Sequence, residues 1–303
     1  MELGMVGLGK MGGNMARRLL QGGHGIVGFD VEAQSVADLV RAGAQGVLSL
    51  EDLVGKLPQP RAVWTMLPSG AATEETVQAL DQLLAPGDTV LDGGNSYYKD
   101  SLRRAGHLGE RGIHFVDVGT SGGIWGLENG YSLMVGGDAD VVDRHRALFE
   151  SLAPAKTLGW AHVGPVGSGH FVKMVHNAVE YGLMQAYAEG FELLAAKEEF
   201  SLDLAQVANV WRHGSVVRSW LLDLTADLLS AEGDLRAVKG WVPDTGEGRW
   251  AVVEAIDQNL SLPVITQALE RRLRSRESEP LSDKILAALR QKFGGHAIER
   301  SLG

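Results

Sequence analysis

The sequence contains no cysteine, and this absence is the first of several that narrow its possible functions. Without cysteine the chain can form no disulfide, thiolate nucleophile or cysteine-ligated metal site, and it suits a reducing compartment such as the cytoplasm. No apolar run approaches the ~20 residues that a membrane-spanning helix needs. Basic residues are also scarce: 28 Lys and Arg stand against 38 Asp and Glu, which leaves a formal net charge of −10. We therefore expect no nucleic-acid or membrane partner, although a local cluster of cations can still bind an anionic substrate.

Glycine, by contrast, is abundant: 40 of the 303 residues are glycine, about twice the usual share of ~7%. This excess indicates tight turns or a close approach of the backbone to a ligand. Hydrophobic residues make up 45% and charged residues 22% of the chain, so disorder along its whole length is excluded.

Up to about residue 163 the sequence alternates short apolar runs with helical patterns. We predict strands at residues 3–7, 25–30, 61–67, 88–91 and 113–118, with late strands at 131–135 and 155–158. We predict helices at residues 11–21 and 33–43. This alternation is typical of a parallel, doubly wound α/β sheet of the Rossmann type, which we assign to residues 1–163.

From about Gly164 the apolar spacing becomes helical and strand-like runs are scarce. The stretch Gly164–Gly169 marks the boundary, because its proline and glycines break the preceding strand before a long helix begins. We expect residues 164–303 to form an all-helical domain.

The segment Gly7-Leu8-Gly9-Lys10-Met11-Gly12 has the spacing G-x-G-x-x-G. It follows a predicted strand, opens a predicted helix and precedes an acid about twenty residues on, which together favour a dinucleotide site. Gly7 would allow the tight turn, Gly9 the approach of the pyrophosphate, and Gly12 the close packing of helix on sheet. The alternative, a glycine-rich turn without a ligand, is disfavoured by that combination. Because the motif begins so early, we expect no signal peptide ahead of it.

Asp30 ends the second predicted strand and would accept hydrogen bonds from the adenosine ribose hydroxyls. Its charge would repel a 2′-phosphate, which favours NAD as the cofactor and leaves NADP possible. In the alternative, Asp30 only caps the turn that follows it. Met66 and Leu67, at the end of another predicted strand, and Asn95 are further candidate cofactor contacts.

Five polar residues follow one face of a predicted helix that begins near Ser168. They stand at i, i+3, i+4, i+7 and i+8: Lys173, His176, Asn177, Glu180 and Tyr181. The rest of the helix is apolar, so it is expected to be buried, and the polar stripe must reach water or line a cleft. A solvated stripe with a surface ion pair is the alternative, but Lys173 and Glu180 are seven residues apart and cannot pair along a helix. We therefore interpret the stripe as an active site.

Three further segments have the composition of a ligand site. The segments Asp92-Gly93-Gly94-Asn95-Ser96 and Ser121-Gly122-Gly123 each follow a predicted strand, where the loops of a parallel sheet face the ligand crevice. Near the C-terminal end, Arg290 and His296 flank a Lys-Phe-Gly-Gly segment. Taken singly, each segment could be an ordinary turn or a helix end.

Together these motifs resemble those of the decarboxylating 6-phosphogluconate dehydrogenases, a group within the β-hydroxyacid dehydrogenases, in their short form. The resemblance covers nearly the whole chain and rests on GLGKMG, DGGNS, TSGG, the helix KMVHNAVEYG, TGEGRW at 245–250 and FGGH. Relatives that act on small hydroxyacids typically carry a second asparagine in place of His176 and lack the acid at Glu180. The resemblance is therefore specific to the decarboxylating group.

The resemblance implies a role for each matching residue. Lys173 matches the catalytic base and Glu180 the catalytic acid. His176 and Asn177 would hold the hydroxyl and carboxylate of the substrate. The matching substrate contacts are Asn95, Ser121, Gly122, Gly123, His176, Asn177 and Tyr181. An arginine matching Arg272, with Arg274 close by, would hold the phosphate, while Arg290 and His296 would reach the site from a partner subunit.

Two departures from the family's long form bear on its ligands. Thr245 stands where the long form has a lysine, so a phosphate contact at this position is in doubt. Asp30-Val31-Glu32 stands where the long form has Asn-Arg-Thr to bind the NADP phosphate. The chain is also far shorter, which implies a homodimer or homotetramer in which another subunit completes the substrate and oligomerisation domain, residues 164–303.

The implied reaction is oxidative decarboxylation of 6-phosphogluconate to ribulose 5-phosphate and CO₂ with NAD(P), in the pentose phosphate pathway and gluconate metabolism. Lys173 could take the hydroxyl proton only as a neutral amine, so its pKa must be lowered from ~10.4 by burial. Protonated Lys173 could then polarise the ketone, no metal is required, and Glu180 would protonate the enediol. Two alternatives remain open: a related dehydrogenase that does not release CO₂, and a dinucleotide-sensing binding protein without catalysis.

Overall fold

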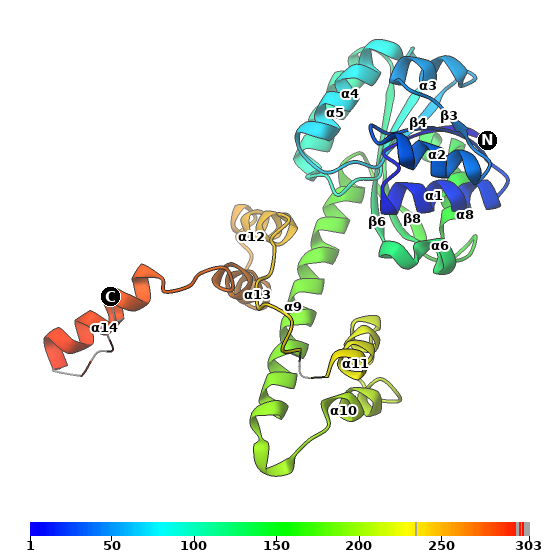
Figure 1. Ribbon diagram of the computed structural model, residues 1–303. Helices are drawn as coiled ribbons and strands as arrows, with labels where there is room; N and C mark the ends of the chain where they lie inside the picture. The colour runs from blue at the N-terminus through cyan, green and yellow to red at the C-terminus, as the bar shows by residue number, and fades with distance from the viewer. Residues whose placement is uncertain (234, 295–296, 298, 300–303) are drawn as a thin grey trace. The chain divides into compact units, whose positions relative to one another are not determined.

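The computed structural model describes residues 1–233, 235–294, 297 and 299. The chain forms two compact units, residues 1–177 and 178–303. The long helix α9, Ser168–Ala196, runs from the first unit into the second (Figure 1). No described helix is both long and apolar enough to cross a bilayer.

The first unit is built on one eight-stranded sheet with the order β3-β2-β1-β4-β5-β6-β7-β8. The strands are β1 Glu2–Val6, β2 Gly25–Phe29, β3 Gln45–Gly46, β4 Ala62–Thr65, β5 Thr89–Asp92, β6 His114–Ser121, β7 Ser132–Gly136 and β8 Trp160–Gly164. β1 to β6 pair in parallel, β7 is antiparallel to β6, and β8 is parallel to β7. The predicted doubly wound α/β sheet is confirmed, with an antiparallel step near one edge.

Helices cover both faces of the sheet, because successive residues of each buried strand point to opposite sides. On β4, Trp64 belongs to one core cluster and Val63 to the other. The first cluster packs under α1 (Lys10–Gln21), α2 (Ala33–Arg41), α7 (Ala139–Arg144) and α8 (Arg146–Leu152). The second packs under α3 (Leu50–Lys56), α4 (Ala71–Leu83) and α5 (Tyr98–Glu110). The short helices η1 (Gly123–Trp125) and α6 (Gly126–Asn129) follow β6.

The described part of the second unit is helical, as predicted. After α9 and the short η2 (Glu198–Phe200) come α10 Leu204–Trp211, α11 Trp220–Glu232, α12 Glu247–Asp257, α13 Pro263–Arg274 and α14 Leu281–Gly294. Phe191 of α9 packs with buried residues of α10 and α11, while Tyr181 of α9 packs with Ala268 and Leu269 of α13.

The predicted strand at residues 155–158 is wrong. Ala155 and Leu158 form only an isolated antiparallel bridge, and Leu158 is exposed. The strand of this region is β8, whose residues 161–163 are exposed at the edge of the sheet. An exposed edge strand needs no apolar run, so the apolar pattern pointed to the wrong segment.

Candidate active site

The glycine loop between β1 and α1 has the geometry that its three glycines predict. Gly7 has φ = 88°, and a Cβ there would lie 2.4 Å from the Met66 carbonyl oxygen. A Cβ on Gly12 would lie 1.9 Å from the Gly7 carbonyl oxygen, so the helix could not pack this closely on the loop with any side chain there. A Cβ on Gly9 would meet nothing within 4 Å. The loop thus has no space for a side chain at Gly7 or Gly12, while the backbone at Gly9 is accessible. This fits a dinucleotide that approaches the backbone at the start of α1.

Asp30 is half-buried directly after β2 and is bonded to the glycine loop. Its Oδ2 accepts the Leu8 N–H at 2.6 Å, and its Oδ1 accepts the Glu32 N–H at 2.8 Å. The second bond is the local cap of the following turn, the alternative role of Asp30. A carboxylate has about four acceptor sites, so both oxygens keep capacity for ribose hydroxyls.

The loops after β1, β4 and β5 lie together at the carboxyl ends of these neighbouring strands. The Met66 N–H donates to the Val6 carbonyl at 2.8 Å, and a Cβ on Gly94 would lie 2.6 Å from the Leu67 carbonyl oxygen. The predicted cofactor residues Met66 and Leu67 therefore border both the glycine loop and the Asp92–Ser96 loop. This edge, where the strand order reverses between β1 and β4, is where doubly wound sheets bind their ligands.

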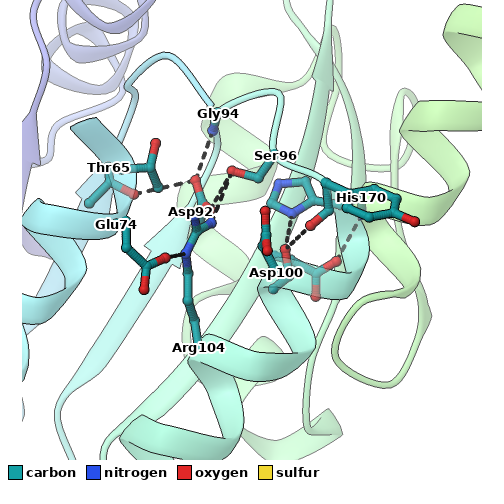
Figure 2. Close-up of polar contacts among 12 residues, drawn as sticks. Thr65, Glu74, Asp92, Gly94, Ser96, Asp100, Arg104 and His170 are labelled. Atoms are coloured by element: carbon teal, nitrogen blue, oxygen red, sulfur yellow. Dashed lines mark hydrogen bonds and ion pairs between the residues drawn. The ribbon is translucent and has the colours of Figure 1, made fainter. Parts of the chain in front are cut away.

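The Asp92–Ser96 loop is organised around the buried carboxylate of Asp92 (Figure 2). One Asp92 oxygen accepts the Gly94 N–H at 3.1 Å and the Thr65 hydroxyl at 3.4 Å, and the other accepts the Ser96 hydroxyl at 2.8 Å. Asn95, the predicted ligand contact, is half-buried between the two residues that Asp92 holds.

The second predicted loop follows β6, where Ser121 is half-buried and Gly122 and Gly123 have φ values of 127° and 55°. The same strand makes a very close contact with α9. A Cβ on Gly119 would lie 2.5 Å from the Lys173 Cβ, so no side chain could be accommodated between strand and helix without displacing one of them. This contact brings the base of the Lys173 side chain next to the strand that ends in Ser121.

Lys173, the predicted catalytic base, is only 8% exposed. The start of its helix is fixed by Asp117, a fully buried residue of β6 that we did not predict. The Asp117 carboxylate accepts the Gly167 N–H at 2.7 Å and the His170 N–H at 2.8 Å. These backbone groups would otherwise lack partners at the helix start, so Asp117 caps the helix one turn before Lys173. The available signal was an acidic residue inside the apolar run at 113–118.

The other members of the predicted stripe also lie on α9. His176 and Asn177 are half-buried, and the His176 Nδ1 lies 3.1 Å from the Asn177 Oδ1. Glu180 is half-buried, seven residues after Lys173, which corresponds to about 10 Å along the helix axis.

Tyr181 and Arg272, two of the predicted substrate residues, are in direct contact. The Arg272 guanidinium carbon lies 3.5 Å from the centroid of the Tyr181 ring, and its Nη1 donates to the Pro243 carbonyl at 3.1 Å. The Tyr181 hydroxyl is buried and has no hydrogen-bond partner among the described residues. Arg274, the other candidate, forms ion pairs with Glu277 and Asp283 instead.

The segment that carries Thr245 is held by its own acidic residues. The Thr245 hydroxyl donates to the buried Glu247. Asp244 pairs with Arg249 at 2.6 Å and accepts the Gly246 N–H at 3.1 Å. Partial burial opposes ionisation of Asp244, but these hydrogen bonds outweigh it and lower the pKa of the carboxyl.

The remaining two predicted residues belong to the end of the chain. Arg290 is exposed on α14, and His296 lies outside the described residues. Their contribution to the site of a partner subunit stays a prediction.

Comparison with known proteins agrees with this architecture. The family model described as the NAD binding domain of 6-phosphogluconate dehydrogenase matches residues 2–164, and the model of the 6-phosphogluconate dehydrogenase C-terminal domain matches residues 169–288.

Individual relatives agree as well. The chain is 41% identical, over 99% of its length and 100% of the relative, to the putative 6-phosphogluconate dehydrogenase YqeC of Bacillus subtilis. It is 44% identical, over 99% of both chains, to an NAD(+)-dependent, decarboxylating 6-phosphogluconate dehydrogenase of Haloferax volcanii. The solved structure of the Plasmodium falciparum 6-phosphogluconate dehydrogenase superposes with a TM-score of 0.82 at 26% identity, covering 100% of this chain and 67% of the other. The family inferred from the motifs is confirmed: the chain belongs to the 6-phosphogluconate dehydrogenase family.

Proposed function

We propose that the protein oxidises 6-phosphogluconate with NAD and releases CO₂ and ribulose 5-phosphate. The observation that carries this proposal is the buried Lys173 on a capped helix that also bears His176, Asn177 and Glu180. The Haloferax volcanii relative, similar over the full length, is named as an NAD(+)-dependent, decarboxylating enzyme.

In the proposed first step, Lys173 removes the proton of the hydroxyl β to the substrate carboxylate. This step needs Lys173 as the neutral amine, because only the neutral amine can accept a proton. The bound dinucleotide supplies the hydride acceptor. His176 and Asn177 orient the substrate by hydrogen bonds to its hydroxyl and carboxylate, which keeps the reacting carbon in place.

In the second step the β-keto acid loses CO₂. The protonated Lys173 donates a hydrogen bond to the new carbonyl oxygen, which accepts the electrons of the breaking carbon–carbon bond. Glu180 then gives its proton to the carbon that carried the carboxylate, and the electrons on the oxygen of the enediolate re-form the carbonyl of the product ketone. The two groups therefore act at different times: Lys173 acts before and during the loss of CO₂, and Glu180 acts after it.

The phosphate end of the substrate is assigned to Arg272 and Tyr181. Stacking on the ring fixes the plane of the Arg272 guanidinium, and a planar guanidinium can bind phosphate with two hydrogen bonds. The Tyr181 hydroxyl, buried and unpaired among the described residues, supplies a further donor.

NAD is the proposed cofactor, because the Asp30 carboxylate would lie close to a 2′-phosphate and repel it. Initial rates on 6-phosphogluconate with NAD and with NADP, with CO₂ followed in parallel, test the whole proposal. A higher kcat/KM with NADP would refute the cofactor preference. NADH without CO₂ would favour the non-decarboxylating dehydrogenase, and cofactor binding without any turnover would favour a dinucleotide-sensing protein.

We also propose a homo-oligomer in which Arg290 and His296 complete the site of a partner. Two inactive variants, Lys173→Met and Arg290→Ala, test this by mixing after unfolding and refolding. In a mixed oligomer, the Arg290→Ala subunit keeps its lysine and receives an intact Arg290 from its partner, so activity should return. Mixtures that stay inactive, with mixed oligomers verified by mass, would contradict shared sites.

A further inference from the structure

Arg104 is a buried cation in the first unit to which the proposed mechanism gives no role. It lies on α5 with its side chain 2% exposed, which is rare for arginine unless the charge is paired. Arg104 is the seventh residue of α5 (Tyr98–Glu110), and its side chain extends back toward the start of the helix and contacts the Asp92–Ser96 loop (Figure 2).

The Arg104 guanidinium joins three groups, one from the start of α4 and two from the Asp92–Ser96 loop. Its Nε lies 2.9 Å from a Glu74 carboxylate oxygen, while its Nη1 lies 3.4 Å from both an Asp92 oxygen and the Ser96 hydroxyl. Glu74 is in the first turn of α4, directly after the loop that contains Met66 and Leu67. Asp92 is the residue that holds Gly94 and Ser96 on either side of Asn95.

These contacts tie the cofactor side of the crevice to its substrate side. The two loops also touch directly, since a Cβ on Gly94 would lie 2.6 Å from the Leu67 carbonyl oxygen. One turn earlier on the same face of α5, the Ser101 hydroxyl lies 2.7 Å from Nδ1 of His170, in the first turn of the helix that carries Lys173. Helix α5 therefore contacts both loops and the start of α9.

We infer that Arg104 is a positioning residue that sets the spacing between the Met66–Gly70 loop and the Asp92–Ser96 loop. It acts through Glu74 on one side and through Asp92 and Ser96 on the other. The inference deepens the proposed function and rests on it for the identity of the ligands. If it holds, changes at Arg104 weaken binding of the dinucleotide and of the substrate together, because Asn95 is assigned to both.

The neighbouring arginine provides a matched control. Arg103 is 55% exposed and forms two hydrogen bonds with the same Glu74, at 2.7 and 2.8 Å, and its other hydrogen bond goes to Asp100 of its own helix at 3.3 Å. Arg103→Ala and Arg104→Ala thus both remove a partner of Glu74, while only the second releases the loop.

The test measures NADH binding by fluorescence titration and steady-state KM and kcat on 6-phosphogluconate. We expect Arg104→Ala to weaken NADH binding and to raise the KM for 6-phosphogluconate and the KM for NAD, each by about tenfold to 100-fold. Arg103→Ala should stay close to wild type. Added guanidinium should restore binding to Arg104→Ala and leave Arg103→Ala unchanged. Arg104→Lys should recover only part of the loss, since one ammonium cannot span Glu74 and Asp92 together.

Several results would overturn the inference. A folded Arg104→Ala protein that binds NADH like wild type would do so, as would equal losses for Arg103→Ala and Arg104→Ala. If Arg104→Ala fails to fold, the same titration is made with Glu74→Gln and Ser96→Ala, which each remove one partner of Arg104. Wild-type NADH binding in both variants would exclude a link between the two loops through Arg104. The binding titration is independent of turnover, so a wild-type protein that binds NADH but does not oxidise 6-phosphogluconate refutes the proposed function alone.

Discussion

The guanidinium of Arg272 stacks on the ring of Tyr181, with 3.5 Å between its central carbon and the ring centroid. Tyr181 is also in close contact with α12, where a Cβ on Gly248 would lie 2.5 Å from the ring. The arginine is thus oriented by a side chain of α9, the helix that also carries Lys173. This contact distinguishes Arg272 from Arg274 as the candidate for the substrate phosphate, a choice that the family resemblance alone left open.

Arg272→Met should raise the KM for 6-phosphogluconate by about tenfold to 100-fold, because a lost charge-assisted hydrogen bond is typically worth ~1.5–3 kcal/mol. Direct NADH binding should stay unchanged. Arg274→Met serves as the control, since Arg274 pairs with Glu277 and Asp283. A larger KM effect in the Arg274 variant would assign the phosphate to that residue instead.

Lys173→Met should abolish both NADH and CO₂ formation, with a loss of about 10⁴-fold or more, because no proton can leave the hydroxyl as hydride departs. Glu180→Gln keeps the shape of the side chain but cannot supply a carboxylic proton. It should allow a first turnover of NADH that is faster than the steady state, with a solvent isotope effect on the slow phase. Stopped-flow absorbance measures both phases. If Glu180→Gln blocks the first hydride transfer as completely as Lys173→Met, Glu180 does not act as the late acid.

Asp117→Asn should lower both stability and activity. The amide oxygen can accept one of the two N–H groups, but the NH₂ group would face the other, so we expect a loss of about 2 kcal/mol or more in the free energy of unfolding. Asp203 is the control, because its carboxylate is exposed and caps α10 by accepting the Gln206 N–H at 3.0 Å. Asp203→Asn should lower the free energy of unfolding by less than ~0.5 kcal/mol, since aspartate and asparagine are about equally good at a helix N-cap. Equal losses in urea titrations of the two variants would contradict the role given to Asp117.

Glu74 makes stability depend on pH. Hydrogen bonds from Arg103 outweigh partial burial and, with those from Arg104, lower the pKa of Glu74 from 4.5 to about 2. A carboxyl whose folded pKa is depressed stabilises the fold above its unfolded pKa and loses that contribution as pH falls through the folded value. Wild type should therefore be more stable than Glu74→Gln near neutral pH, and the difference should shrink between pH 4.5 and about 2. A difference that stays constant over this range would exclude the ion pair as its source.

The sequence predicted the sheet and the glycine loop well because both leave local signals. Gly7, Gly9 and Gly12 are recognisable from their spacing together with the strand and helix predicted on either side, and five of the parallel strands are short apolar runs. The two-residue strand β3 is too short to carry a pattern, and β8 is exposed at an edge, so neither could be found in this way.

The residues that hold the site in place were harder to predict than those that line it. Lys173 and Glu180 share a helix, so their periodicity is visible in the sequence. Asp117, Arg104 and Glu74 act through partners far away in the chain: Asp117 is 50 residues from Gly167 and Arg104 is 30 from Glu74. A charged residue in or beside an apolar run was the only available signal, and it does not identify the partner.

Helix α9 passes from one compact unit into the other without a break, with Lys173 before the division and Glu180 after it. The separation of the proposed base and acid is therefore a property of helical geometry, two turns of one continuous backbone, and needs no agreement between two separately folding parts. A single inserted residue between them would turn one group about 100° away from the other, although every residue of the stripe would still be present. If Lys173 and Glu180 act as proposed, deletions or insertions within α9 should be far less tolerated than substitutions of its apolar residues.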